Sequence, residues 1–441
     1  MKYARVGAAL TVFAVVASAC SGSTASPSAA ASQSAPGSAA ASSGAAGPAI
    51  DVKVGIEFPM SGGEAPNGVP SANGVTLALE QIKVPGFNIT INQQDDAVNG
   101  QHNPQQGAKN MQTLVNDPQV LFVVGPYNSN VGAAEIPVGN AAGLAQCSPA
   151  NTNPGLTKTW PSYDFKALRA TNPDKNNYFR TATTDDLQGA AGADIAFNIA
   201  KAKTAYVADD VEAYGKGLAD VFVTSFEKLG GKVVARDSIP TSTTDFSSFV
   251  TKLQGLKPDY VFYGGVTTSG IGLFRNQMAQ AGLQTIPLGG GDGIVDGAAS
   301  VQSSYLQVAG DGAVNSYGTT AGPHDVSSDA TPSQTDLTAA YKAKYNTEPG
   351  AYTAASYACT QTFLQALKDV GPSAGGDLAK LREAIRAYLA DPSHTYQTAV
   401  GTFSFDAAGD TSQKIISYFQ YDATTKDWKF LSQRDFAKNP F

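Results

Sequence analysis

The chain has 441 residues, of which 42% are hydrophobic and 15% are charged, so it can bury full cores, and its length predicts two or three domains of roughly 150 residues. Its 30 basic and 37 acidic side chains give a net charge of −7 without any basic cluster, which excludes a nucleic-acid partner. The three cysteines and three histidines lie far apart, which excludes zinc-finger, CxxC and HExxH sites, and we expect no metal and no cofactor.

Residues 1–19 have the pattern of a signal peptide. Two basic residues, at positions 2 and 5, precede an apolar run at 6–16 that is too short to span a hydrocarbon core of about 30 Å. The small residues at 17–19 then lead into Cys20, an order similar to a bacterial lipobox, in which the cysteine carries lipid. The alternative is an ordinary secretory signal, with Cys20 at the mature N-terminus by accident.

Residues 20–50 are expected to be a flexible tether. After Cys20 the segment holds only Ser, Ala, Gly, Pro, Thr and Gln with one terminal Ile, and it carries no charge. Such a segment has no large side chains from which to form a core. A tether after a lipidated cysteine suits a soluble domain held at a membrane, where two or more acyl chains give stable anchoring. The folded part therefore begins near Asp51.

From residue 51 onward, short β-branched runs alternate with stretches of helical spacing. Strands are predicted at 52–56, 89–91 and 120–124, and the pattern restarts with runs at 204–208, 232–235 and 260–263. Strand, helix and strand in that order favour parallel βαβ units. Because one sheet holding all these strands would be unusually large, the sequence predicts two doubly wound α/β lobes.

The segments that directly follow the apolar runs are candidates for a binding site, because ligands bind at the carboxyl ends of parallel strands. They are rich in glycine, small and hydroxyl side chains, and they lie at 59–63, 125–130, 148–153, 209–210, 264–267 and 289–293. This composition suits hydrogen bonding to a small ligand better than acid–base chemistry.

The sequence carries no G-x-S-x-G nucleophile elbow and no G-x-x-x-x-G-K-[ST] phosphate loop. We therefore expect that the protein is not an enzyme. The acid pairs at 95–96, 185–186 and 209–210 are interpreted as solvated loop carboxylates, since adjacent residues on a turn usually point apart. His102, His324 and His394 have polar, loop-like neighbours and are expected at the surface.

Several short motifs follow one another in a fixed order along the chain. The most specific is S-P-A-N-T at 148–152, within G-L-A-Q-C-S-P-A-N-T-N-P-G-L-T at 143–157. The others are P-M-S-G at 59–62, G-P-Y-N-S at 125–129, F-R-T at 179–181, Y-G-K-G-L-A at 214–219, D-F-S at 245–247 and F-Y-G-G at 262–265. Together they resemble the periplasmic leucine/isoleucine/valine-binding proteins, the type I solute-binding proteins of ABC importers. The likeness covers nearly everything from Asp51 to the C-terminus.

The resemblance implies a periplasmic binding protein type I fold, in which two Rossmann-like lobes are joined by a three-segment hinge and the ligand cleft lies between them. The chain would cross between lobes near Thr183, near Asn315 and around 396–405. Residues 51–183 and 315–395 would then form the N-terminal lobe, and 184–314 and 396–441 the C-terminal lobe.

The resemblance also implies a function. The protein would be an exported lipoprotein on the outer face of the cell membrane that captures a branched-chain or related amino acid, or a similar small polar solute, by lobe closure. It would deliver this ligand to the permease of an ABC importer. The alternatives are a ligand-sensing subunit of a receptor and a secreted serine hydrolase that uses Ser129.

The family's ligand contacts carry over to particular positions. Ser129 and backbone N–H groups, at Ala150 and Thr152, would hold the α-carboxylate of the ligand. The carbonyl of Ala150, the hydroxyl of Thr152 and the carboxylate of Asp292 would hold the α-ammonium, although Asp292 is alternatively a turn residue in a glycine-rich loop. A zwitterion in a cleft needs such donors at one end and an acid at the other, or its charges stay unpaired.

The chain differs from the family at positions that contact the side chain of the ligand. Tyr214 matches a family aromatic, and alternatively it packs at a helix start. Asn67 and Val266 stand where the binders of aliphatic amino acids have aromatic residues. The pocket is therefore expected to have a different shape and to be more polar.

Cys147 and Cys359 either form a disulfide or remain two separate buried thiols. Oxidation is the default in an exported protein, and the family's chain order implies that both cysteines lie in one lobe. The bond would brace the loop around Ala150 without hindering closure.

Overall fold

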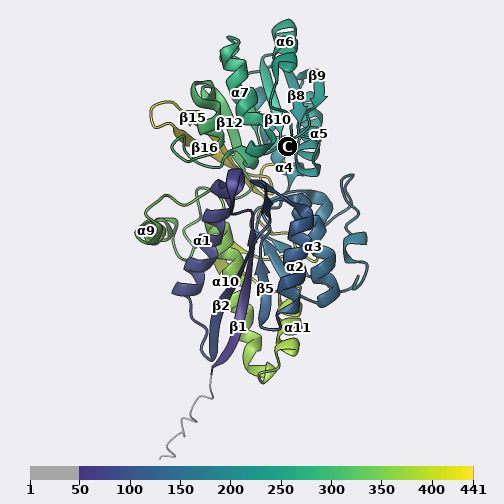
Figure 1. Ribbon diagram of the computed structural model, residues 1–441, viewed down its shortest axis with the longest axis vertical. Coiled ribbons are helices and arrows are strands. Elements are labelled where there is room, and N and C mark those ends of the chain that lie inside the picture. Colours follow the sequence, from purple (N-terminus) through teal and green to yellow (C-terminus); the bar gives the residue numbers. More distant parts are fainter. Residues whose placement is uncertain (1–48, 441) are drawn as a thin grey trace, which may run out of the picture. The chain divides into compact units, whose positions relative to one another are not determined.

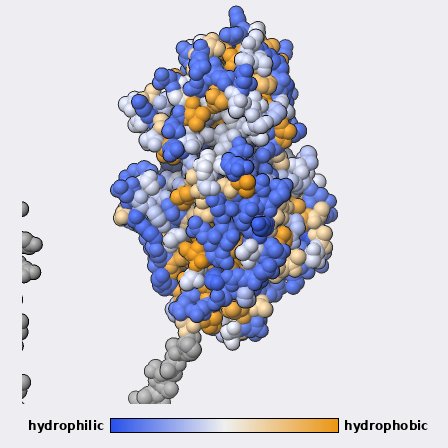
Figure 2. Space-filling view, viewed as in Figure 1, coloured by the Kyte–Doolittle hydropathy of each residue, from blue (hydrophilic) through white to orange (hydrophobic). Residues whose placement is uncertain are grey.

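The computed structural model describes residues 49–440. The predicted signal peptide, Cys20 and nearly all of the predicted tether lie outside the described residues. Within residues 49–440, no helix has the length and apolar character needed to cross a membrane. On the face shown in Figure 2, hydrophilic residues predominate and hydrophobic ones lie in small, scattered groups.

The first lobe is built on a sheet of five parallel strands in the order β2-β1-β5-β6-β7. The strands are β1 (Ile50–Phe58), β2 (Phe87–Asp95), β5 (Val120–Val124), β6 (Ala145–Ser148) and β7 (Tyr178–Arg180). One face is covered by α2 (Pro104–Asn116) and α3 (Ser129–Ala142), and the other by α1 (Ala65–Gln81), α10 (Thr353–Ala374) and α11 (Leu378–Leu389) (Figure 1). Because helices cover both faces, β5 is a continuous apolar run.

The second lobe is built on a seven-stranded sheet in the order β16-β15-β12-β11-β10-β8-β9. The strands are β8 (Thr204–Asp209), β9 (Lys232–Ser238), β10 (Tyr260–Gly264), β11 (Leu288–Gly290), β12 (Ser316–Thr320), β15 (Ile415–Asp422) and β16 (Asp427–Asp435). The first five are parallel, while β15 and β16 are antiparallel additions at one edge. Helices α4 (Asp185–Asp194) and α5 (Ala213–Lys228) lie on one face, and α6 (Ser247–Leu256), α7 (Ile271–Gln280) and α8 (Tyr305–Ala309) lie on the other. Two doubly wound α/β lobes are thus confirmed.

Smaller elements complete the first lobe. The hairpin of β3 (Ala97–Val98) and β4 (Gln101–His102) follows β2, and α9 (Gln334–Tyr345) packs against α1. A second hairpin, β13 (Tyr396–Thr398) with β14 (Gly401–Phe403), contacts α10.

Two of the three crossings between the lobes lie later in the chain than the sequence predicted. The first falls between β7 and α4, at the expected position near Thr183. The second follows β12, which pairs with β11 and β15 of the second sheet, so the chain leaves that sheet after Thr320 and not near Asn315. The third precedes β15, since Phe405 still packs on Phe179 of the first lobe.

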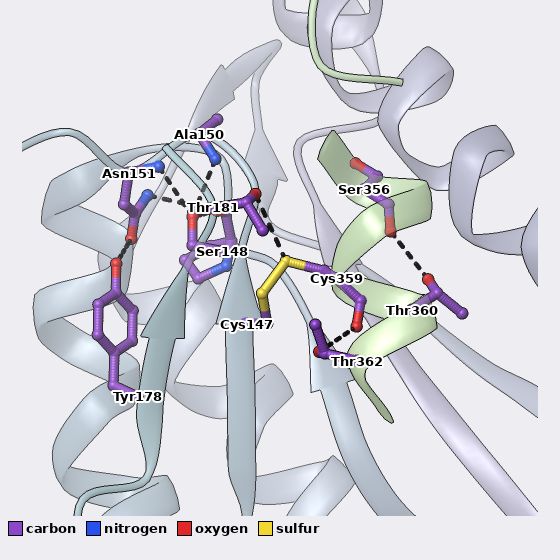
Figure 3. The surroundings of a disulfide bond; sticks show 11 residues. Cys147, Ser148, Ala150, Asn151, Tyr178, Thr181, Ser356, Cys359, Thr360 and Thr362 are labelled. Carbon is purple, nitrogen blue, oxygen red and sulfur yellow. Dashed lines mark hydrogen bonds between the residues drawn. A yellow bond between two sulfur atoms is a disulfide. The ribbon is translucent and has the colours of Figure 1, made fainter. Parts of the chain in front are cut away.

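A disulfide joins Cys147, in β6, to Cys359, in α10 (Figure 3). Their Cα atoms lie 5.7 Å apart although 212 positions separate them in the chain. Both cysteines belong to the first lobe, so the bond does not cross the cleft. It anchors the end of β6, directly before the loop that contains Ala150.

We expect peptide mapping of unreduced, denatured protein to recover the 147–359 peptide pair as one linked species, because disulfides persist in oxidising compartments once they are formed. Thiol counting on the same sample should then find neither cysteine free. Two titratable thiols at these positions would contradict the assignment.

Candidate functional site

A partly enclosed cavity lies between the two lobes. The first lobe contributes Tyr127, Asn128, Ser129, Asn130, Ala150 and Thr152 to its walls, and the second contributes Glu212, Tyr214, Val266, Asp292 and Gly293. Four of the segments that follow predicted strands therefore line one space, as the topology of parallel sheets requires.

The cavity brings together six of the seven residues that the sequence singled out as ligand contacts. Asn67 is the exception, because it is absent from the cavity wall. Its side chain is buried and accepts a hydrogen bond from the hydroxyl of Tyr127 at 3.2 Å. Asn67 therefore positions Tyr127, which does line the cavity.

The N-terminus of α3 is part of the cavity wall. Asn128 is the N-cap residue, yet its side chain accepts no hydrogen bond from the first turn of the helix. The N–H of Val131 donates to the side chain of Asn130 at 2.9 Å, and the partial positive charge of the helix start attracts a carboxylate. The hydroxyl oxygen of Ser129 accepts the backbone N–H of Asn153 at 3.3 Å, so its proton is free to donate.

The loop that carries Ala150 and Thr152 is held by polar side chains beneath it (Figure 3). The hydroxyl of Ser148 donates to the carbonyl of Pro126 at 2.7 Å and accepts the N–H of Asn151 at 2.8 Å. The amide of Asn151 donates to the carbonyl of Tyr127 at 2.7 Å. The S-P-A-N-T motif thus ties the loop after β6 to the loop after β5.

Arg180, which the sequence offered only as part of a motif, supports the same loop. Its guanidinium donates to the carbonyls of Asn151 and Asn153, at 3.1 and 2.8 Å, and its Nε donates to Asp410 at 2.7 Å. Both charged side chains are buried. Burial alone would raise the pKa of Asp410, but the charge of Arg180 lowers it below the usual value.

A buried acid, Asp292, also lines the cavity. One carboxylate oxygen accepts the hydroxyl of Tyr214 at 2.8 Å, and the other accepts the hydroxyl of Tyr352 at 2.9 Å. Burial raises the pKa of Asp292, while hydrogen bonds such as that from Tyr214 oppose the rise. Asp292 does begin a short 3-10 turn after β11, and the turn aims its carboxylate at the cavity.

Asp185, a second acid beside the first, was interpreted as a solvated loop residue, and that interpretation is wrong. It is the first residue of α4, it is fully buried, and neither of its carboxylate oxygens has a hydrogen-bond partner within the described chain. Its backbone N–H donates to the carbonyl of Thr152 at 2.9 Å. Burial, and then repulsion by Asp292, raise the pKa of Asp185 well above its usual value. Two neighbouring buried acids favour the entry of a cation beside Asp292, because a cation favours the ionised form of each.

The sequence profile of a known family, the periplasmic binding proteins, matches residues 51–423. The chain belongs to this family. Leu/Ile/Val-binding protein homolog 3 from Brucella melitensis is 30% identical over 378 residues, which cover 84% of this chain and 92% of that protein. An amino acid binding protein from Pseudomonas aeruginosa is 28% identical over 84% of this chain and 90% of its own.

A crystal structure of LivJ from Streptococcus pneumoniae, a branched-chain amino acid transporter substrate-binding protein in complex with isoleucine, has a TM-score of 0.71. It is 25% identical to this chain and covers 87% of it and 99% of LivJ. A solute-binding protein from R. palustris in complex with benzoate is 22% identical, with a TM-score of 0.68 over 87% of this chain and 96% of that one, and supports the fold alone. The resemblance to type I, leucine/isoleucine/valine-binding-like proteins is therefore confirmed.

Other acids and one histidine of this binding protein also lie deeper than expected. Asp96, Asp209 and Asp210 are buried, and burial raises the pKa of Asp210 to about 7. His102 is buried as well, between Glu64 and Glu212, at 3.1 and 3.0 Å from its two ring nitrogens. His324 is exposed, as predicted, and His394 is half-buried against Tyr388.

Three acids form a buried cluster in the first lobe, away from the cavity. Glu57, Asp96 and Glu135 are fully buried, and each has at least one carboxylate oxygen without a hydrogen-bond partner in the described structure. Burial is the main cause that raises the pKa of each. The cluster is therefore stable only while it keeps protons.

We expect Glu135→Gln to stabilise the protein increasingly as pH rises. In the unfolded chain Glu135 ionises near its ordinary pKa of about 4.3, whereas the folded protein keeps it protonated to higher pH. Its contribution is thus fully present below that pH and is lost as pH rises through the raised pKa. The difference between variant and wild type should grow by up to about 1.4 kcal/mol per pH unit, measured by urea unfolding between pH 5 and 8. Glu227→Gln, at an exposed position, is the matched control, and equal pH slopes for wild type and Glu135→Gln would contradict the expectation.

Proposed function

We propose that this protein is the extracytoplasmic substrate-binding component of an ABC importer and that it captures a free α-amino acid, branched-chain or related. The observation that carries the proposal is the set of polar groups in the cavity wall. The wall holds the start of α3 with the hydroxyl of Ser129, and it also holds the buried carboxyl group of Asp292, with Asp185 buried behind Thr152. A carboxylate beside Ser129 and an ammonium beside Asp292 would pair these groups.

The ligand's α-carboxylate is held by the hydroxyl of Ser129 and the backbone N–H of Thr152. The N–H groups of Ala150, which the family resemblance had also implied, and of Asn151 already donate to the hydroxyl of Ser148, at 3.2 and 2.8 Å. Its α-ammonium donates to Asp292, to the hydroxyl oxygen of Thr152 and to the carbonyl of Ala150. Asp185 lies directly behind Thr152, since its N–H is bonded to that residue's carbonyl. Its raised pKa favours the protonated form next to Asp292, and an entering ammonium favours the ionised form of both acids, so an analogue without an ammonium group is expected to bind more weakly.

The side chain of the ligand lies against Tyr214 and Val266, with Tyr127 held in place by Asn67. Relatives named as Leu/Ile/Val-binding proteins and the isoleucine complex of LivJ support an aliphatic amino acid. Val266 leaves more room than an aromatic residue would, and Asn130 and Glu212 add polar groups to the wall. Branched-chain amino acids and somewhat larger or more polar relatives are thus the class to test.

Capture proceeds by closure of the two lobes over the ligand. Each lobe provides one part of the cavity wall, so the full set of contacts exists only when the lobes are shut, and the ligand shifts the population towards the closed form. Polar contacts already join the lobes, including Tyr352 to Asp292 and the amide of Asn153 to the carbonyl of Ala213 at 2.9 Å. The three crossing segments act as the hinge, and the closed form docks on the permease.

Calorimetry with three matched compounds tests the proposal. L-isoleucine carries both charges, 3-methylpentanoic acid lacks the ammonium and 2-methylbutylamine lacks the carboxylate. We expect binding of isoleucine, or of another amino acid of this class, and weaker binding of either analogue by about 30-fold to several thousandfold, because each leaves some polar groups of the cavity unpaired at about 2–5 kcal/mol. Equal affinity for the amino acid and an analogue would show that the cavity does not recognise the two charges of a zwitterion.

The proposal includes a lipid anchor on Cys20, which rests on the sequence pattern around that residue. We expect wild-type protein to fractionate with membranes and Cys20→Ser to be released or to remain unprocessed, because the acyl chains are lost. Ser21→Ala, at the next position, serves as the control and should keep the wild-type distribution. A processed Cys20→Ser protein that still sediments with membranes would place the anchor elsewhere.

A further inference from the structure

A cluster of polar side chains bridges the two lobes at one edge of the cavity. His102, at the end of the β3–β4 hairpin in the first lobe, lies between Glu64 of the same lobe and Glu212 of the second. Its Nδ1 is 3.1 Å from Oε1 of Glu64, and its Nε2 is 3.0 Å from Oε2 of Glu212. The imidazole thus contacts one carboxylate of each lobe.

Further hydrogen bonds join the same two lobes beside His102. The amide of Asn130 donates to the carboxylate of Glu212 at 3.0 Å, and the hydroxyl of Thr268, in the second lobe, donates to Glu64. The amide of Gln101, next to His102, donates to the carbonyl of Thr268 at 3.4 Å. Glu212 and Asn130 are also part of the cavity wall.

Acidic side chains surround His102. Glu64 and Glu212 contact it directly, and Asp96 and Asp210, whose pKa values are themselves raised, interact with it through space. Glu64 is buried at 1% exposure, and the side chain of His102 is 5% exposed, so little water screens the group. The two carboxylates in direct contact favour the positively charged form of the imidazole.

We propose that His102 is a positioning residue for ligand capture: its imidazolium latches the second lobe to the first by binding Glu64 and Glu212 together. This inference rests on the proposed function, since it concerns closure over the same cavity. A protonated imidazole has two N–H donors, one for each carboxylate. A neutral imidazole has one, so loss of the proton leaves one carboxylate without its partner and leaves two like charges close together.

The latch makes closure dependent on pH. Burial alone would lower the pKa of His102, but its hydrogen bonds to Glu212 and Glu64 raise it well above the usual value. In the open form Glu212 has moved away, and the pKa falls. The closed form therefore holds the proton more tightly, and closure is favoured below the pKa of the closed form and weakened as pH rises through it.

The first experiment needs no added ligand, because it uses natively purified protein, which is expected to retain its own ligand and therefore to have closed lobes. Nuclear magnetic resonance of histidine-labelled protein reports the titration of each of the three histidines in the chain, with His102 assigned from the His102→Gln variant. We expect His102 to titrate above 6.5 and Glu212→Gln to lower its midpoint, whereas Glu227→Gln, on an exposed face of the same lobe, leaves it unchanged. An unchanged midpoint in Glu212→Gln would overturn the latch, whatever the ligand is.

The second experiment follows the affinity for L-isoleucine by calorimetry from pH 6 to 9. We expect wild-type affinity to fall by up to about tenfold per pH unit above the open-form pKa, as uptake of one proton requires. His102→Gln should bind more weakly at pH 6 and show a flat profile, while His394→Gln keeps the wild-type slope. A slope retained in His102→Gln would assign the effect to Asp96 or Asp210 and overturn the proposal. Absence of isoleucine binding at every pH would contradict the proposed ligand class, and the histidine titration would still decide the latch.

Discussion

Arg180→Met is expected to be among the most destabilising single substitutions in the described chain, with a loss of about 3–5 kcal/mol in the free energy of unfolding. The substitution leaves Asp410 buried without its partner, and it removes the donors to the carbonyls of Asn151 and Asn153. Urea unfolding of the variant measures the loss. Because Asp410 lies directly before the last crossing, the same change should also loosen the attachment of the second lobe.

The double variant Arg180→Met/Asp410→Leu is the matched control. It removes both charges, so no carboxylate is left unpaired, and we expect it to recover a large part of the stability that Arg180→Met loses. The carbonyls of the loop remain unpaired in both, and the ligand affinity of the double variant should stay reduced. If Arg180→Met and the double variant were equally unstable, the pairing with Asp410 would not be the cause.

Asp292→Asn is expected to weaken ligand binding by about 30-fold to several thousandfold, which corresponds to about 2–5 kcal/mol. The amide still contacts the hydroxyls of Tyr214 and Tyr352, so the fold of the cavity is kept, but the ligand's ammonium loses its charge partner. Calorimetry with the amino acid that binds the wild type measures the change.

Asp311→Asn, an exposed position in the same lobe, has the same loss of charge and should bind like the wild type. Asp185→Asn should weaken binding less than Asp292→Asn does, because Asp185 is not part of the cavity wall. A change below threefold in Asp292→Asn would mean that another acid pairs with the ligand.

Much of the fold follows from local sequence pattern. The run at 120–124 is a strand of the same bounds in the structure, because a strand buried on both faces must be apolar throughout. β12 shows the opposite case: its sequence S-Y-G-T-T carries no apolar run, and it is a strand because β11 and β15 pair with it on either side. Pairing between distant segments therefore decided where the chain returns to the first lobe.

The site residues also divide into those that local sequence could predict and those that depend on distant segments. Ser129, Thr152 and Asp292 follow strands or short turns, and their positions could be predicted from the order of the motifs. Asp185 and His102 could not, because what buries them is remote: His102 meets Glu212 across 110 positions. Polar neighbours in the sequence suggested a solvated surface, whereas Asp185 is fully buried and the side chain of His102, between residues of both lobes, is only 5% exposed.

Mass spectrometry of the small molecules released when natively purified protein is denatured tests most directly whether the cavity holds a zwitterion. We predict about one equivalent of a free α-amino acid per chain, and none from Asp292→Asn purified in parallel. Release of a compound without a paired carboxylate and ammonium, such as an aromatic carboxylate, in equal amounts from both proteins would contradict the account.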